Sequence, residues 1–210
     1  MLFKDRHDAG KQLAKKLRKF KNKKDVIVLG IPRGGVEVAF EVAKLLRVPL
    51  SIVVTKKIGH PFEAEFAIGA VSPGNYIVDE SYEKEAGKEY IQNTVREMNR
   101  EIKRRYAEYT KGKMPELRNK VTIIIDDGLA TGYTMLAAIK YIKSKNPKKV
   151  IAAIPVAAQD SFEKVKEIAD VVVCLQVPVF FSAVGSFYQE FTQSEDEEVK
   201  YYLEEARKYC

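Results

Sequence analysis

The sequence predicts an α/β fold built on one doubly wound, mostly parallel sheet. Three short apolar runs without polar alternation indicate strands that are buried on both faces, namely Val26–Leu29, Val121–Ile125 and Val150–Ile154. A turn of small or polar residues follows each run, and apolar residues at helical spacing come next. Strand and helix patterns that alternate in this way are typical of βαβ units wound around a parallel sheet. We therefore expect a single α/β domain.

Length, charge and cysteine content narrow the class of protein. The chain has 210 residues, which suits one large domain, and a formal net charge of +7. An excess of basic residues is typical of proteins that bind anionic substrates or nucleic acid. Abundant Lys mixed with Glu is also typical of an ordinary solvated surface. No apolar run approaches about 20 residues and no export signal is seen, so we expect a cytoplasmic protein without membrane contact. Cys174 and Cys210 have no CxxC partner, which argues against a disulfide framework or a zinc site.

The other predicted elements continue this alternation. Ala9, Leu13 and Leu17 lie on one stripe of a basic amphipathic helix predicted over residues 8–21. The other predicted helices follow Gly35 and Thr134, span 82–110 and 162–168, and begin at a capping box of Ser194 and Glu197. The other predicted strands are residues 50–55, 67–71, 76–78 and 171–175.

The most informative stretch is Val121–Thr134, which reads VTIIIDDGLATGYT. Asp126 and Asp127 follow the buried strand directly, and a loop of small and hydroxyl residues leads into the next helix. Backbone N–H groups that enter a helix bind anions such as phosphate, and glycine lets the backbone approach a ligand closely. Two carboxylates would repel a phosphate but suit hydroxyl groups or a cation. A sugar phosphate satisfies both halves, whereas an acidic pair that only caps a turn is the structural alternative.

Two further stretches carry positive charge beside predicted strand ends. Gly30–Gly35 reads GIPRGG and leads from a strand into a helix, where Arg33 offers a planar fork of donors to an anion. Lys56 and Lys57 follow the strand predicted over residues 50–55. The carboxyl ends of neighbouring parallel strands meet at one edge of a sheet, so we expect these groups to share one site with the acidic pair.

The acidic pair and its loop resemble the 5-phosphoribosyl-1-pyrophosphate (PRPP) signature of type I phosphoribosyltransferases. The stretch lacks the Gly-Lys-Thr of a Walker loop and the glycine spacing of a Rossmann fingerprint. The PRGG turn, the basic pair and the tail Phe191–Glu198 extend the resemblance over the whole chain. With them the chain resembles a group of phosphoribosyltransferases whose acceptor is undefined. The resemblance implies a core of about residues 22–175 and a hood from residues 1–21 and 176–210.

The resemblance also implies a role for each site residue. Asp126, Asp127 and Lys57 would be catalytic, with the two acids on the ribose hydroxyls. The 5′-phosphate would bind the loop formed by Gly128, Leu129, Ala130, Thr131, Gly132, Tyr133 and Thr134. The pyrophosphate would contact Arg33, Gly34, Gly35, Lys56, Lys57 and His60, and the Pro32–Arg33 peptide would be cis. Mg²⁺ would be held mainly by the substrate, with Asp126 and Asp127 as the protein groups that could touch it.

Some assignments stay open at this point. His60 could contact pyrophosphate, or it could be a polar loop residue without a role. By the resemblance, residues 56–66 would form a lid over PRPP. Phe180, Phe181 and Tyr188 would hold the acceptor base by stacking, or they could form a hydrophobic flap that packs on the core. Hypoxanthine and guanine enzymes carry an Asp where this chain has Ala130, so 6-oxopurine salvage is disfavoured.

The expected activity is transfer of a 5-phosphoribosyl group from PRPP to a nitrogenous base or other nucleophile, with release of pyrophosphate. This is a pentosyltransferase reaction (EC 2.4.2.-) of nucleotide metabolism, and the resemblance implies a homodimer that uses Mg²⁺. The alternative is a PRPP-sensing regulator that binds nucleic acid and catalyses nothing. The net charge and the basic residues Arg100, Lys103, Arg104 and Arg105 permit that alternative, although no winged-helix pattern supports it.

Overall fold

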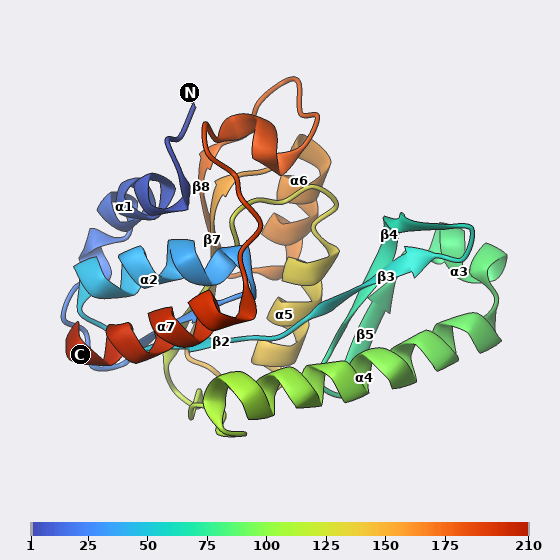
Figure 1. Cartoon of the computed structure of the whole chain (residues 1–210), viewed down its shortest axis with the longest axis horizontal. Helices are drawn as coiled ribbons and strands as arrows, with labels where there is room; N and C mark the ends of the chain where they lie inside the picture. The colour runs from blue at the N-terminus through green and yellow to red at the C-terminus, as the bar shows by residue number, and fades with distance from the viewer. Residues whose placement is uncertain (1, 210) are drawn as a thin grey trace.

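The main sheet organises the fold. The computed structural model describes residues 2–209, so Cys210 lies outside the described residues. Five parallel strands form the sheet in the order β2-β1-β6-β7-β8 (Figure 1). They are β1 (Val26–Gly30), β2 (Leu50–Ile52), β6 (Val121–Ile125), β7 (Lys149–Val156) and β8 (Val171–Gln176). The parallel order confirms the predicted doubly wound α/β fold.

Helices cover both faces of this sheet, which explains the apolar runs. One face carries α1 (Arg6–Lys16) and α2 (Gly34–Leu46), and the other carries α5 (Tyr133–Lys143) and α6 (Gln159–Ile168). In β1, Val26 and Val28 pack in the core under α1 and α2, whereas Ile27 and Leu29 pack in the core under α5. Each strand therefore buries consecutive side chains on opposite sides, and no position is left for polar residues.

The strand order reverses between β1 and β6. From β1 the chain first adds β2 on one side, and it later adds β6, β7 and β8 on the other side. The pairs Val26↔Val121 and Gly30↔Ile125 keep β1 and β6 level, so both strands end at the same height. Open parallel sheets bind ligands at such a switch point, beyond the carboxyl ends of the strands.

A second, antiparallel sheet projects to one side of the main sheet (Figure 1). It contains β3 (Lys56–His60), β4 (Glu63–Ser72) and β5 (Asn75–Val78). Ala67 and Ala70 pack in the core that contains α5, whereas Ile68 and Val71 pack in the core that contains α4 (Lys88–Thr110). The small sheet is therefore sandwiched between two helices.

Part of this hairpin was predicted incorrectly. The sequence placed no strand at residues 56–60, extended the preceding strand to Thr55 and began the next strand only at Ala67. In the structure β2 ends at Ile52, and β3 and β4 pair from Lys56↔Val71 to His60↔Glu63. The lysines, glycine and glutamates of these strands have low strand propensity, so the local sequence does not indicate a strand. The strands form because they pair with each other.

Several helix boundaries also differ from the prediction, including the start of α6, which begins at Gln159 and not at residue 162. α1 begins at Arg6, because the Asp5 side chain accepts a hydrogen bond from the Asp8 N–H at 2.7 Å. It ends at Lys16, and a 3₁₀ turn over Arg18–Phe20 follows it. The helix predicted over 82–110 is two helices, α3 (Glu80–Ala86) and α4, because Gly87 interrupts it with a φ of 80°.

The last helix, α7 (Asp196–Ala206), also begins one residue later than predicted. Its capping box uses Glu195 and Glu198 in place of Ser194 and Glu197. Ser194 is instead buried, and its hydroxyl has no hydrogen-bond partner within residues 2–209. A short 3₁₀ turn, η3 (Arg207–Tyr209), follows α7. In the described chain no helix has both the length and the apolar character needed to span a membrane.

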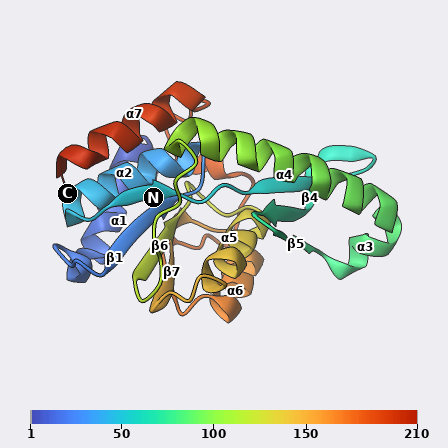
Figure 2. The same ribbon diagram turned by 90° about the horizontal axis from the view of Figure 1, so that it is seen from below.

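The N-terminal segment pairs with the segment after β8 beyond the carboxyl edge of the main sheet. The Phe3 N–H donates to Phe187 O at 2.9 Å, and the Gln189 N–H donates to Phe3 O at 2.8 Å. Phe187 closes the 3₁₀ turn η2 (Val184–Phe187). Helix α1 lies against α2, and α7 lies between α2 and α4 (Figure 2). The hood boundaries stay a prediction.

Candidate active site

A cavity of about 620 Å³ lies at the switch point between β1 and β6. Its walls come from the loops after β1, β2 and β6, from the β3–β4 hairpin, from α4 and from the segment after β8. The acidic pair, the small-residue loop, the PRGG turn and the basic pair were predicted to share one site, and residues from all four stretches line this cavity.

The acidic pair forms part of the cavity wall and is held by several hydrogen bonds. The Asp127 N–H donates to Asp126 Oδ1 at 3.0 Å, and the Thr134 hydroxyl approaches Asp126 Oδ2 at 3.5 Å. The Tyr188 hydroxyl donates to the carbonyl oxygen of Asp127 at 2.6 Å. Both acids therefore have fixed positions before any ligand arrives.

The two acids differ in their electrostatic surroundings. Burial raises the pKa of Asp126 well above its ordinary value, and the charge of Asp127 raises it further. The positive charge of Lys57 opposes this shift. Asp127 instead has a charged partner, because Arg6 Nε donates to its Oδ2 at 2.9 Å. A ligand that brings hydroxyl groups or positive charge would stabilise the ionised form of Asp126.

Arg6 is a site residue that the sequence did not reveal. Its side chain is only 7 % exposed, and it reaches Asp127, the Thr192 carbonyl oxygen at 2.8 Å and the face of Phe191 at 3.9 Å. Arg6 therefore ties the N-terminal helix to the acidic pair and to the C-terminal segment. Its partners lie 121 and 186 residues away in the chain, so no local pattern could have indicated them.

The loop after β6 is fastened to the neighbouring strand and helix. The Leu129 N–H donates to Val156 O, and the Ala158 N–H donates to Leu129 O, both at 2.9 Å. The Ser161 hydroxyl donates to Ala130 O at 2.5 Å. Gly132 adopts a φ of 79° at the N-cap of α5, a conformation that favours glycine. These contacts present the loop and the start of α5 to the cavity.

Six of the seven residues predicted for phosphate binding line the cavity, and Tyr133 does not. Residues 128–132 and Thr134 contribute to its wall, together with the N-terminal end of α5. Tyr133 is buried, and its hydroxyl donates to Asp79 Oδ2 at 2.7 Å. That contact fastens α5 to the end of the small sheet.

The PRGG turn brings Arg33 and Gly34 to the cavity. The Pro32–Arg33 peptide is cis, as the resemblance predicted. A Cβ on Gly34 would collide with Asp127 Oδ2 and lie 2.7 Å from Arg6 Nε, so this position accepts only glycine without rearrangement. Gly35 lies behind the wall, where a Cβ would lie 2.8 Å from the carbonyl oxygen of Ile125.

Lys56 and Lys57 line the cavity from the start of β3, but His60 does not. His60 lies near the tip of the hairpin, where its ring contacts those of Phe62, Phe66 and Tyr82. Its Nε2 lies 3.4 Å from Glu85 Oε1. These contacts give His60 a packing role at the hairpin tip.

The three aromatic residues predicted for the acceptor do not line the cavity. Phe180 is 91 % exposed, and Phe181 stacks on Phe187 with ring centroids 5.5 Å apart. Tyr188 is buried against Phe3, and its hydroxyl is occupied by Asp127. The segment after β8 instead brings Val184 and Phe191 to the cavity. Phe191 was visible only as the first residue of the tail resemblance.

The described residues offer no ready-made metal centre. Between residues 2 and 209, no three His, Cys, Asp or Glu side chains are grouped so that they could hold a metal ion. Asp126, Asp127 and Glu65 are the carboxylates that line the cavity, and Asp127 already pairs with Arg6.

Comparisons with known proteins agree with this geometry. Residues 4–190 match the family model described as the phosphoribosyl transferase domain. A Mycobacterium tuberculosis H37Rv protein that carries the name of a phosphoribosyl transferase is 39% identical over 215 residues, which cover 99% of this chain. That alignment covers 47% of the relative, so the chain spans about half the length of the curated relatives it matches first.

A solved structure and a shorter match extend the comparison. The crystal structure of TT1426 from Thermus thermophilus is 35% identical, covers 98% of this chain and 99% of its own, and superimposes with a TM-score of 0.81. A uracil phosphoribosyltransferase of Aquifex aeolicus is 34% identical over 55 residues, which are 26% of each chain. The extent of the domain match and of these identities makes the chain a member of the phosphoribosyl transferase domain family.

Proposed function

We propose that the protein transfers a 5-phosphoribosyl group from PRPP to a nitrogenous base or another nucleophile and releases pyrophosphate. One observation carries this proposal: an acidic pair, a phosphate-type loop and a cluster of cationic side chains line a single cavity. PRPP carries the complementary groups, which are two ribose hydroxyls, a 5′-phosphate and a pyrophosphate. The reaction belongs to the pentosyltransferases (EC 2.4.2.-).

Each part of the substrate has a matching wall. The 5′-phosphate would lie on residues 128–132, where the loop meets the N-terminal end of α5 and its unpaired N–H groups. The ribose hydroxyls would donate to Asp126 and Asp127. The pyrophosphate would then extend toward Arg33, Lys56 and Lys57.

Bond cleavage at the anomeric carbon would be assisted by charge on both sides. As the bond from C1 to the pyrophosphate oxygen breaks, the ribose gains positive charge, and the ionised acids offset it. The electron pair of the broken bond stays on pyrophosphate, where the cationic side chains stabilise the negative charge. The acceptor then bonds to C1 and loses its proton.

Magnesium fits this site as a partner of the substrate. Mg²⁺ keeps most of its ligands from water and substrate phosphates, so the absence of a three-residue metal cluster among the described residues is compatible with it. When bound, the ion would neutralise phosphate charge, and Asp126, Asp127 and Glu65 are the carboxylates that line the cavity where it would lie.

The acceptor would lie against Val184 and Phe191. Both line the cavity beside the acidic pair, and Phe191 is held from behind by Arg6 and by Tyr188, whose ring centroid lies 5.1 Å away. Phe191→Ala is expected to raise KM for the acceptor about tenfold and to change KM for PRPP less than twofold. The loss corresponds to one aromatic contact of about 1–1.5 kcal/mol. Equal changes in both KM values would contradict this placement.

Pyrophosphate release tests the proposed function. Purified protein is incubated with PRPP and Mg²⁺ across a panel of purine and pyrimidine bases and amines. Turnover with one of these acceptors is the expected result. PRPP binding without turnover, together with salt-dependent binding of RNA or DNA, would favour a regulator instead. The homodimer expected from the resemblance is a separate proposal, which analytical ultracentrifugation of the same sample tests.

A further inference from the structure

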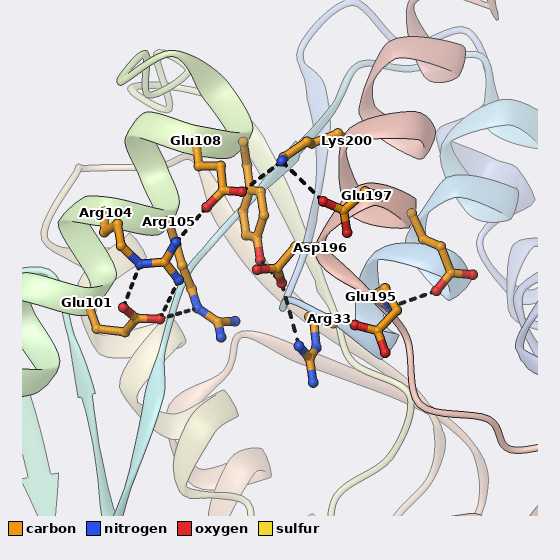
Figure 3. Close-up of polar contacts among 11 residues, drawn as sticks. Arg33, Glu101, Arg104, Arg105, Glu108, Glu195, Asp196, Glu197 and Lys200 are labelled. Carbon is orange, nitrogen blue, oxygen red and sulfur yellow. Dashed lines mark hydrogen bonds and ion pairs between the residues drawn. The ribbon is translucent and has the colours of Figure 1, made fainter.

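Helix α4 lies outside the main sheet, yet it contributes a charged side chain to the cavity. Arg105 lines the cavity together with Arg33 and Lys56. Figure 3 shows the guanidinium groups of Arg105 and Arg33 on opposite sides of a common space, one from α4 and the other from the loop after β1. Three cations from three separate elements therefore meet at one end of the site.

Arg105 is held in place by its own helix. Its Nε donates to Glu101 Oε1 at 2.9 Å, and its side chain is only 14 % exposed. Arg104 holds the same carboxylate with two hydrogen bonds, at 2.8 Å and 2.9 Å, so Glu101 is fixed from both sides. No acceptor within residues 2–209 bonds the two terminal nitrogens of Arg105, which leaves one edge of the guanidinium for a ligand.

Arg33 is held in a similar way by residues from two other elements. Its Nη1 lies 3.6 Å from Asp196 Oδ1 at the start of α7. The Tyr109 hydroxyl of α4 donates to the same oxygen at 2.6 Å. Asp196 therefore fixes Arg33 while it remains a partner of α4.

Two more side chains lie at this end. Lys56 forms no ion pair among the described residues, and the buried Thr55 hydroxyl beside it has no hydrogen-bond partner there. Burial lowers the pKa of Lys56, and the positive charges of Arg105 and Arg33 lower it further, partly opposed by Glu101. Neighbouring positive charges destabilise the protonated form of Lys56, and an anion bound among them would stabilise all three charges.

We propose that Arg105 is a further substrate-binding residue, which binds the pyrophosphate group of PRPP together with Arg33 and Lys56. This inference rests on the proposed function and assigns part of the active site to α4. A diphosphate fits better than a single phosphate because two adjacent phosphoryl groups present more oxygens than one guanidinium fork can satisfy. A nucleic-acid surface fits less well, because Arg105 faces a cavity and Arg104 is committed to Glu101 and Glu108.

Calorimetric binding of three ligands tests the inference. Pyrophosphate, PRPP and ribose 5-phosphate are titrated, in the presence of Mg²⁺, into the wild type and the variants Arg105→Gln, Arg105→Lys and Arg96→Gln. Arg96 is the matched control, because it lies on the same helix, is exposed and does not line the cavity. Arg105→Gln is expected to weaken pyrophosphate and PRPP binding at least tenfold and ribose 5-phosphate binding less than twofold.

The other variants separate charge, geometry and folding. Arg105→Lys should recover part of the lost pyrophosphate affinity, because it restores the charge but not the fork. Arg96→Gln should bind all three ligands within twofold of the wild type. Pyrophosphate binding by Arg105→Gln within twofold of the wild type would overturn the inference, as would an equal loss for ribose 5-phosphate. If the wild type bound neither PRPP nor pyrophosphate, the proposed function would fail and this inference with it.

Discussion

Asp126→Asn is expected to remove most of the activity and at the same time to stabilise the fold at neutral pH. The variant loses a charge that offsets the developing positive ribose, so kcat/KM should fall on the order of a hundredfold to a thousandfold. The carboxylate is costly to fold, because burial and Asp127 raise its pKa. Asn keeps an oxygen for the Asp127 N–H and removes that cost, so the unfolding midpoint should rise by a few degrees.

The pH dependence of this gain in stability follows from the raised pKa of Asp126. A carboxyl group whose folded pKa is raised costs no stability below its unfolded pKa of about 4, and the cost grows as the pH rises toward the folded pKa. The stability difference between Asp126→Asn and the wild type should therefore be large at pH 8 and shrink toward pH 4. Thermal unfolding across this pH range measures it, and a less stable variant at pH 8 would contradict the assignment.

Asp127→Asn is the matched comparison, and it should act in the opposite direction on stability. This change removes the nearer carboxylate of the buried Arg6 guanidinium and leaves only Glu37, at 4.0 Å, so it is expected to cost about 3 kcal/mol of folding free energy. The double variant should lose PRPP binding in calorimetry while its circular dichroism spectrum keeps the α/β signature. Unchanged PRPP affinity in the double variant would remove the acidic pair from the site.

Gly34→Ala is the second change with a large expected effect. The new methyl group would collide with Asp127 Oδ2 and Arg6, so the turn or the acidic pair has to move. A displacement of about 1 Å at a reacting centre typically costs on the order of a hundredfold in rate, and we expect at least that loss in kcat/KM. Steady-state kinetics of pyrophosphate release measures it.

Gly74→Ala controls for the general cost of replacing glycine. Gly74 has a φ of 74° in the turn between β4 and β5, where an added Cβ meets no atom within 4 Å. This variant should be less stable by about 1 kcal/mol, with nearly unchanged kinetics. If both glycine variants lost activity in proportion to their stability, the collision at Gly34 would not explain the loss.

Local patterns in the sequence predicted the sheet and the centre of the site. Val26–Gly30 and Val121–Ile125 are buried on both faces, so their strand character is visible without any neighbour. The acids and the loop follow β6 at consecutive positions. Predicting where that strand ends was therefore enough to predict where all of these residues lie. The parallel arrangement then brought the PRGG turn beside them.

The residues that complete the cavity could not be found in this way. Arg105 lines the cavity from α4, Val184 and Phe191 line it from the segment after β8, and Arg6 holds the acidic pair from α1, so none of them is a sequence neighbour of the predicted site. Aromatic character alone was also misleading, because the exposed Phe180 and the buried Tyr188 have the composition expected of a base-binding wall but not its position. The directions of the side chains after β8 depend on how this segment pairs with the N-terminal segment around Phe3, and neither segment alone encodes that pairing.

The connection between β2 and β6 has a consequence for how this family can diverge. Residues 53–120 leave the main sheet at one strand and return at another, and they carry β3–β5, α3 and α4. The pairing of β1 with both β2 and β6 fixes the two attachment points, whereas the connection itself packs on α5 through Ala67 and Ala70 and reaches Asp196 of α7 through Tyr109. If PRPP binds as proposed, a change of charge in this connection would alter the contacts to the pyrophosphate, while the loop proposed for the 5′-phosphate, which follows β6, would keep its residues.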